Sequence, residues 1–511
     1  MVLGLTVAVF VWDRLPVAIV AVGVALSLWA TDVLELQQAL AGFGDPTVIF
    51  IASLFVVSEA LDSAGVTTWA GQQVVSRAGE SRTRVLVLLM LLCAALTALI
   101  TVNGSVAALV PVVVVMAVRL RRRPSELLIP LAFAAHAGSL LVLTGSPVNV
   151  VIAEAADDAG VGRITYFEFA LVGLPLLAGT VAIVVLLSGR LLPERTPRSM
   201  PSDFSAHAQT LVHQYGLDTA EELLTRTSGV AEVVIPPRSE LVGQVAYPGM
   251  VTESGDLVVL AVQRREEALP GESVLAVGDT LLLQGSWGSL GYHLDDPDVR
   301  VVDAPEQVRR QTVSLGPGAK RALVVLAGMV ALLATGAVPP AVTGLLAACA
   351  IVLSGVLSIE QAYHGIGWTT VILVAGMIPL STAMTESGAA EALAGGLIDL
   401  AGDSGPHVLL LGLVVLVLGL GQLISNMATA LIVIPIAISA AAELDVSPKP
   451  MLMGVAVAAA AAFLTPVATP ANLMVKEPGG YRFGDYWRMG LPLLALFGLV
   501  AVLLVPVIWS F

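Results

Sequence analysis

Four short polar stretches interrupt long apolar runs of the sequence. Their letters are TVNGS (residues 101–105), LTGSPVN (143–149), SNMAT (425–429) and LTPVATPAN (464–472). Proline and glycine free backbone carbonyl and amide groups from their helical partners, and such groups are tolerated in apolar surroundings only inside protein or beside a wet cavity. Freed carbonyls and the oxygens of Ser, Thr and Asn suit a hard cation, whereas the N-termini of interrupted helices suit an anion. The stretches therefore predict an ion-binding region.

Pairing the two stretches of each half predicts two cation pockets with an anion between them. The first cation pocket would consist of Asn103, Thr144, Gly145, Ser146 and Asn149. The second would consist of Ser425, Asn426, Thr465, Ala468, Thr469 and Asn472. The anion would contact Asn103, Gly104, Ser105, Pro147, Ser425, Asn426, Met427, Thr429 and Pro470. The structural alternative is that Pro and Gly only bend packed helices, with Ser and Thr hydroxyls bonding back to nearby carbonyls.

His136 precedes the second polar stretch within an apolar run. We expect a packing histidine there, and a proton-coupling role is the alternative.

The composition defines the surroundings of these stretches. The chain has 511 residues, of which 57% are hydrophobic and 13% are charged, and its mean hydropathy is +0.89. A soluble protein cannot bury so much apolar surface, so we expect a polytopic membrane protein with the lipid bilayer around it. The net charge of −14 argues against nucleic acid as a partner.

The two halves of the sequence resemble each other. Residues 42–65 match residues 365–388, and we call the displacement that carries the first segment onto the second the repeat offset. The same offset relates Asn103 to Asn426 and Asn149 to Asn472, and VGLPLL at residue 172 is echoed by MGLPLL at residue 489. These ordered matches predict an internal duplication.

The arginines predict how the halves are oriented. Basic residues at 77, 82 and 84 and at 119 and 121–123 flank the apolar residues 85–118, so both ends of that stretch should be cytoplasmic. This stretch is too short for two full membrane-spanning helices, which favours a re-entrant hairpin. Counting spans outward from this hairpin predicts inverted repeats, which together with helices broken at corresponding positions are typical of secondary transporters. The predicted location is the cell inner (plasma) membrane, with multiple passes.

The predicted fold is an all-α polytopic membrane protein with a small cytosolic α+β domain inserted between two inverted repeats. Each repeat would have about five spanning helices and one re-entrant hairpin. The predicted domains are residues 1–188, 189–317 and 318–511, and the core of the inserted domain would be about residues 226–292. Alternating apolar residues in GVAEVV, DLVVLAVQ and DTLLLQG predict three of its strands.

The second-half motif SNMATALIVIP, followed by TPVATPANLMVKEPGGYRFGDYWRMGLP, resembles the divalent anion–sodium symporter family. Ser425 and Asn426 match the family's Ser-Asn-Thr signature, with Met427 in place of its threonine. The resemblance covers both membrane halves and implies sulfate or a di- or tricarboxylate as substrate, sodium as the coupling ion, a homodimer and an elevator-like movement. The inserted segment resembles the TrkA C-terminal domain, which implies a small cytosolic ligand or a dimer contact, with a structural spacer as the alternative.

The leading functional hypothesis is a sodium-coupled transporter of a small divalent anion. A proton-coupled transporter, or an exporter of another oxyanion or an organic sulfonate, is the alternative within transport. A TrkA-regulated ion channel is disfavoured because no TVGYG-like filter occurs. The sequence has no HExxH, GxSxG or P-loop motif, so we expect no enzymatic activity, and no cofactor besides the coupling ions.

Overall fold

The chain divides into two compact units. The computed structural model describes residues 2–12, 14–78, 81–119, 122–193, 195, 228–252, 254–265, 267–269, 271–294, 297–302, 315–316, 318–401, 405–466 and 468–511. Residues 1–61, 70–200 and 321–511 belong to the first unit, which we call the helical unit, and residues 62–69 and 201–320 to the second, the sheet unit. The predicted linker between residue 189 and about residue 226 lies mostly outside the described residues.

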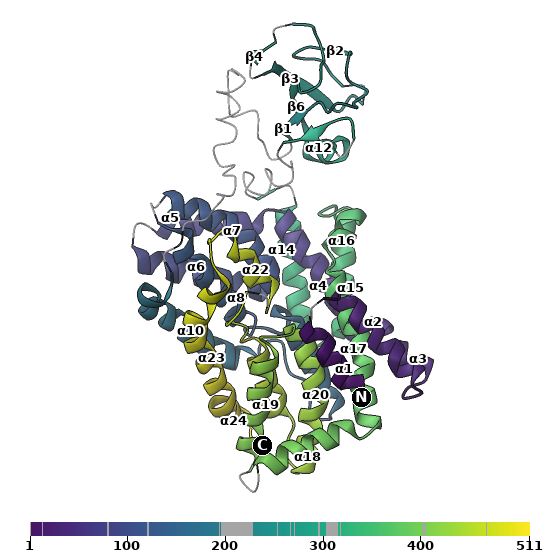
Figure 1. Ribbon diagram of the computed structural model, residues 1–511, viewed down its shortest axis with the longest axis vertical. Coiled ribbons are helices and arrows are strands. Elements are labelled where there is room, and N and C mark those ends of the chain that lie inside the picture. Colours follow the sequence, from purple (N-terminus) through teal and green to yellow (C-terminus); the bar gives the residue numbers. More distant parts are fainter. Residues whose placement is uncertain are drawn as a thin grey trace. The chain divides into compact units, whose positions relative to one another are not determined.

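Helices account for the helical unit (Figure 1). The first half of the chain contains α1 (Val2–Trp12), α2 (Val17–Ala30), α3 (Leu36–Leu40), α4 (Pro46–Ser63), α5 (Val66–Ala78), α6 (Arg82–Leu99), α7 (Val102–Arg119), α8 (Leu128–Gly138), α9 (Pro147–Asp158) and α10 (Ala170–Leu191). The second half contains α14 (Ala319–Thr335), α15 (Pro340–Leu353), α16 (Ile359–Gly365), α17 (Trp368–Glu386), α18 (Ala389–Ala401), α19 (Pro406–Leu420), α20 (Asn426–Glu443), α21 (Lys449–Ala459), α22 (Pro470–Lys476), α23 (Tyr486–Leu499) and α24 (Val505–Ile508). Short 3-10 turns are at Ala41–Gly44, Pro124–Glu126, Leu143–Gly145 and Phe483–Asp485, and a π turn at Val500–Leu504 joins α23 to α24.

The order and spacing of the helices repeat along the chain. The repeat offset carries both ends of α2 onto the ends of α15, and both ends of α5 onto the ends of α18. Helices α6 and α7 lie toward one end of the helical unit, whereas α19 and α20 lie toward the other (Figure 1). The inversion of the two halves in a membrane stays a prediction.

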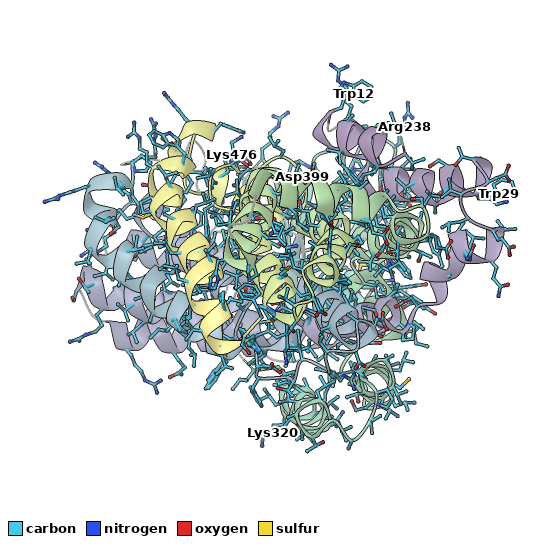
Figure 2. All side chains as sticks on the ribbon, turned by 90° about the horizontal axis from the view of Figure 1, so that it is seen from below. Trp12, Trp29, Arg238, Lys320, Asp399 and Lys476 are labelled. Atoms are coloured by element: carbon cyan, nitrogen blue, oxygen red, sulfur yellow. The ribbon has the colours of Figure 1, made fainter. Side chains whose placement is uncertain are left out.

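The helical unit is that of a polytopic membrane protein. Among the described residues, six helical segments are long and apolar enough to cross a membrane, namely Leu36–Ser63, Arg82–Leu99, Ala170–Leu191, Trp368–Glu386, Asn426–Glu443 and Phe483–Ile508. Large apolar side chains such as Leu174 and Val324 are exposed, as lipid solvation allows. Trp12 and Trp29 point outward at the edge of this unit (Figure 2). The predicted number of about five spans per repeat stays a prediction.

Two helices are broken at the predicted polar stretches. We call residues 139–146, between α8 and α9, the first break, and residues 460–469, between α21 and α22, the second break. Proline begins the helix after each break, at Pro147 and Pro470, where its missing N–H leaves no helical bond unmade.

Two helix hairpins bring the other polar stretches inward. The first joins α6 to α7 through residues 100–101, and the second joins α19 to α20 through residues 421–425. Of the polar stretch TVNGS, Thr101 lies in this connection, whereas Asn103 and Gly104 already belong to α7. Thr101 Oγ1 accepts a hydrogen bond from the Gly104 amide at 3.2 Å and so starts the helix early, which places Asn103 in the first turn of α7.

Loops of each half hold the broken helix of the other. Tyr481, after α22, donates its hydroxyl to the Ser125 carbonyl at 2.6 Å and accepts the Ile129 amide at the start of α8. Conversely, Glu168, just before α10, pairs with Lys449 at the start of α21 at 2.6 Å. The two halves of the helical unit are therefore interlocked around their breaks.

The sheet unit contains antiparallel strands and one described helix of its own. Its strands are β1 (Ser228–Val234), β2 (Val245–Ala246), β3 (Leu257–Arg264), β4 (Glu267–Ala268), β5 (Ser273–Val274), β6 (Thr280–Ser286) and β7 (Arg300–Val301). The main sheet has the order β4-β3-β6-β1-β7, and β2 pairs with β5 separately. Helix α12 (Trp287–His293) buries Trp287 and Leu290 in the core of this unit. The three predicted strands are confirmed as β1, β3 and β6.

Candidate functional site

The four polar stretches meet at one cavity in the helical unit. Its volume is about 460 Å³. The predicted site residues that line it are Asn103, Ser146, Pro147, Asn149, Ser425, Asn426, Met427, Ala468, Thr469 and Pro470. Residues related by the repeat offset thus contribute to a single space.

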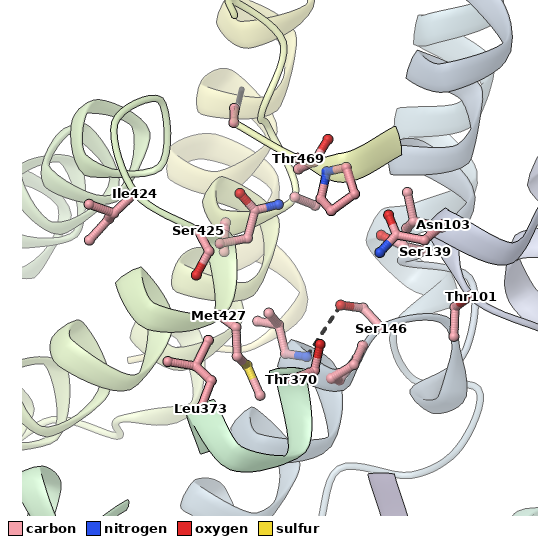
Figure 3. Close-up of a pocket in the computed structure, with 18 of the residues that line it drawn as sticks. Thr101, Asn103, Ser139, Ser146, Thr370, Leu373, Ile424, Ser425, Met427 and Thr469 are labelled. Atoms are coloured by element: carbon pink, nitrogen blue, oxygen red, sulfur yellow. Dashed lines mark hydrogen bonds between the residues drawn. The ribbon is translucent and has the colours of Figure 1, made fainter. Parts of the chain in front are cut away.

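The hairpin tips approach the cavity from opposite sides. Figure 3 shows Asn103 on one side and Ser425 on the other, with Met427 and Leu373 below them. Ser425 caps helix α20 by accepting the Ala428 amide at 3.2 Å. The Oδ1 atom of Asn426 is buried and has no hydrogen-bond partner among the described residues. A buried acceptor without a donor is costly, so this amide oxygen is available to a ligand.

Asn149 fixes the shape of the first break. Its Nδ2 donates to the carbonyl oxygens of Ser139 at 2.7 Å and Val142 at 3.0 Å. These bonds satisfy carbonyls that the interruption of the helix has released, and they assign the orientation of the amide. Asn149 Oδ1 receives no hydrogen bond from any described residue. Ser146 caps α9 by accepting the Val148 amide at 3.2 Å (Figure 3).

Asn472 fixes the shape of the second break, as Asn149 does for the first. Its Nδ2 donates to the carbonyl oxygens of Ala462 at 2.7 Å and Thr465 at 3.0 Å. Thr469 caps α22 by accepting the Asn472 amide at 3.4 Å. The two breaks therefore share one pattern of side-chain bonds to the backbone.

His136 distinguishes the two breaks. It lies on α8 of the first half and is 2% exposed. Its Nε2 is 3.3 Å from Asn472 Oδ1, in the first turn of α22, and 3.3 Å from Thr469 Oγ1, at the end of the second break. The repeat offset carries His136 onto Ala459, whose methyl group can form no such bond. Among the described residues, His136 therefore joins the halves beside the second break, and its counterpart Ala459 does not do so beside the first.

Glycines of the repeated GLP motif support the backbone of both breaks. A Cβ atom on Gly173 would overlap the carbonyl oxygen of Leu140, and one on Gly490 would overlap that of Phe463. Helices α10 and α23 can therefore approach the breaks only because glycine stands at these positions. This contact explains why VGLPLL and MGLPLL recur at corresponding places.

Several predicted site residues do not line the cavity, because their polar atoms have other partners. These residues are Gly104, Ser105, Thr144, Gly145, Thr429, Thr465 and Asn472. Ser105 bonds to Thr97, and Thr144 Oγ1 lies 2.9 Å from the Tyr166 hydroxyl. Thr429 donates back to the Ser425 carbonyl at 3.1 Å, as the structural alternative expects of a helical threonine. Their roles in binding stay predictions.

Other lining residues were missed by the sequence reasoning. They come mainly from helices outside the polar stretches and include Phe10, Phe55, Thr369, Thr370 and Leu373. Thr369 and Thr370 could have been predicted from the sequence. They belong to GIGWTTVIL, one of the repeated segments, and place two hydroxyls at the start of α17.

The cavity has a neutral lining. None of the described residues that line it is Lys, Arg, Asp or Glu, and His136 is the one ionisable side chain among them. An ion that enters must therefore be stabilised by backbone dipoles, by neutral oxygens and by other ions.

A membrane-embedded unit whose helix breaks surround a cavity is typical of a membrane transporter. The family model described as "Citrate transporter" (CitMHS) matches residues 7–445 and 330–511, and the chain belongs to this family. It is 30% identical to the "Uncharacterized transporter YfbS" of Escherichia coli over 100% of this chain and 98% of that protein.

Two other similarities are more distant. The "Sodium/sulfate cotransporter 1" of Chlamydomonas reinhardtii is 25% identical over 55% of this chain and 33% of that protein. The crystal structure of the Alcanivorax borkumensis YdaH transporter matches 98% of both chains with a TM-score of 0.52 and 15% identity, which is a likeness of fold.

Proposed function

We propose that the protein is a sodium-coupled secondary transporter of a small divalent anion such as sulfate or a dicarboxylate. The observation that carries the proposal is the neutral cavity, into which two tips and two breaks bring amide and hydroxyl oxygens. The substrate class is supported by membership of the citrate transporter family and by the similarity to the sodium/sulfate cotransporter of Chlamydomonas reinhardtii.

Charge balance links the anion to a cation. A dianion that leaves water for a cavity without Lys or Arg loses hydration that no side-chain charge replaces. Sodium ions held by amide and carbonyl oxygens would supply the missing positive charge beside the anion. An anion without its cations would then bind poorly, which is the condition for coupled transport.

The anion itself would lie at helix N-termini. Helices α7, α9 and α20 begin at the cavity and have 18, 12 and 18 residues. Each contributes partial positive charge and free backbone amides to a nearby anion. This arrangement would suit oxyanions and carboxylates alike, so the size and shape of the cavity would select between them.

The proposal includes the movement and the assembly expected from the sequence. The hairpins at opposite ends of the helical unit support two inverted repeats and an elevator-like exchange of access between the membrane faces (Figure 1). We propose a homodimer in the inner membrane with the sheet unit in the cytoplasm, where a TrkA C-terminal-like domain would bind a small ligand.

Uptake into proteoliposomes tests this function. Labelled sulfate, succinate and citrate would be offered with an inward sodium gradient, with choline in its place, and with a proton gradient. The proposal expects uptake of at least one anion that requires sodium. Uptake of none of them under any gradient would contradict anion transport.

Proton coupling is the alternative that a specific observation favours. His136 is the one ionisable side chain among the described residues that line the cavity, so protons would have to act through it. Uptake driven by the proton gradient in choline, and lost in His136→Gln, would favour this alternative over sodium.

A further inference from the structure

The four asparagines at the tips and breaks are not equivalent. Asn103 and Asn426 correspond by the repeat offset, as do Asn149 and Asn472. Asn103, Asn149 and Asn426 line the cavity. The buried amide oxygen of Asn426 has no hydrogen-bond partner among the described residues, and the bonds of Asn149 are those that its Nδ2 donates. Asn472 is outside the lining, and its oxygen faces His136 Nε2 at 3.3 Å. Of the four asparagine side-chain oxygens, that of Asn472 therefore already has a protein partner, His136.

The surrounding hydrogen bonds identify the donor and the acceptor in the contact between His136 and Asn472. Asn472 Nδ2 donates to two carbonyls, so the group that faces His136 is the acceptor Oδ1. His136 Nε2 must then carry the hydrogen and donate it. The same hydrogen lies within reach of Thr469 Oγ1, which is also 3.3 Å away from this nitrogen. His136 thus directs positive partial charge at two oxygens of the second break.

The corresponding place at the first break has no such donor among the described residues. Helix α21 packs against α9 as α8 packs against α22, but Ala459 occupies the position of His136. Ala459, Ser146 and Asn149 all line the cavity. Asn149 is 1% exposed, and its Oδ1 has no hydrogen-bond donor among the described residues and has the cavity beside it. A cation at this place would contact Ser146 Oγ and Asn149 Oδ1, as His136 contacts Thr469 and Asn472.

We propose that His136 occupies the place of a cation at the second break, so that the two cation pockets of this transporter have unequal affinities. The first pocket, with Asn149 and Ser146, binds tightly. The second retains Asn426 but lacks the Asn472 and Thr469 oxygens, and binds weakly. The inference rests on the proposed function, because it assumes that cations enter these pockets.

Sodium titration of the purified full chain tests the inference, with binding of labelled sodium as the readout. The wild type should show a tight and a weak phase, with dissociation constants at least tenfold apart. Asn149→Ala should remove the tight phase, and Asn426→Ala the weak one. His136→Ala should tighten the weak phase at least fivefold, because it frees the Asn472 oxygen and recreates the residue that the fold already has at Ala459.

His136→Gln separates hydrogen bonding from packing. Its side-chain amide can still donate to Asn472 Oδ1, but it cannot form the edge-on contact that His136 makes with Phe463 at 5.7 Å between ring centroids. We expect the weak phase of this variant to stay as in the wild type. If His136→Ala and His136→Gln tighten the weak phase alike, or if neither variant changes it, the inference is wrong while sodium-coupled transport stands. If wild-type protein binds no sodium and its uptake ignores sodium, the proposed function fails as well.

Discussion

Asn149 and Asn472 bind the backbone in the same way in the two halves of the chain. Each donates its amide hydrogens to the carbonyls ten and seven residues before it, at 2.7 and 3.0 Å. A side chain that bonds two released carbonyls holds the polypeptide in a bend that a continuous helix would straighten. The symmetry of the cavity therefore depends on these two residues before any ion or substrate is bound.

Replacing either asparagine by alanine should destabilise the helical unit. Two buried carbonyls lose their donor, and each such loss costs about 1–3 kcal/mol. Asn472→Ala should be the more harmful of the two, because His136 also loses its acceptor. Thermal unfolding in detergent measures the melting temperatures, which should fall from the wild type to Asn149→Ala to Asn472→Ala. Equal melting temperatures for all three proteins would contradict the prediction.

Asn426→Ala should instead leave stability intact and reduce the response to sodium. Its Oδ1 has no partner among the described residues, so the substitution breaks no bond there. We expect the sodium-dependent rise in melting temperature to fall by at least half, with no decrease in choline, and Asn103→Ala should behave similarly. Thr429→Val is the matched control, because Thr429 bonds to its own helix and does not line the cavity. An unchanged sodium response in both asparagine variants would remove these oxygens from the site.

Gly173→Ala and Gly490→Ala should each displace a break. The added methyl group would overlap a carbonyl oxygen, and relief of such overpacking costs about 1–3 kcal/mol. Anion uptake should fall together with the melting temperature, because the same backbone shapes the cavity. Gly23→Ala in α2 is the control, since its methyl group would meet no atom within 4 Å. Wild-type uptake by both variants would show that the close approach is dispensable.

Acid should loosen the sheet unit through Asp279. Its carboxylate accepts two hydrogen bonds from Arg264 at 2.7 Å, and this guanidinium keeps the pKa of Asp279 below its ordinary value. Because the folded-state pKa is the lower one, the stabilisation is complete above the ordinary pKa of an aspartate, near 4, and is lost as the pH falls through the folded-state value.

Hydrogen exchange of peptides from β3 and β6 in the full chain measures this effect. After correction for the intrinsic rate, protection in the wild type should be lost only as the pH falls below about 4. Asp279→Asn should already exchange several-fold faster at pH 7, and it should lose the acid-dependent step. If the wild type and Asp279→Asn lose protection at the same pH, the acid-dependent loss must come from a group other than Asp279.

Both helix breaks, and their correspondence between the two halves, could be predicted from the amino-acid sequence. Pro147 and Pro470 disfavour continuation of a preceding helix, and each is followed two residues later by an asparagine that can bond released carbonyls. These are local effects of covalent structure, so they can be read without coordinates. The repeat offset then relates each break to its counterpart in the other half.

Which of these polar atoms lack a protein partner could not be predicted from the sequence, because it depends on how distant segments pack. Thr144 and Thr429 have the residue types of ion ligands, yet one contacts Tyr166 and the other bonds back to its own helix. His136 and Asn472 are far apart in the chain, and no local pattern relates them. A buried hydroxyl or amide bonds to whichever partner packing places within about 3 Å, so its availability to an ion is fixed by neighbours from distant segments.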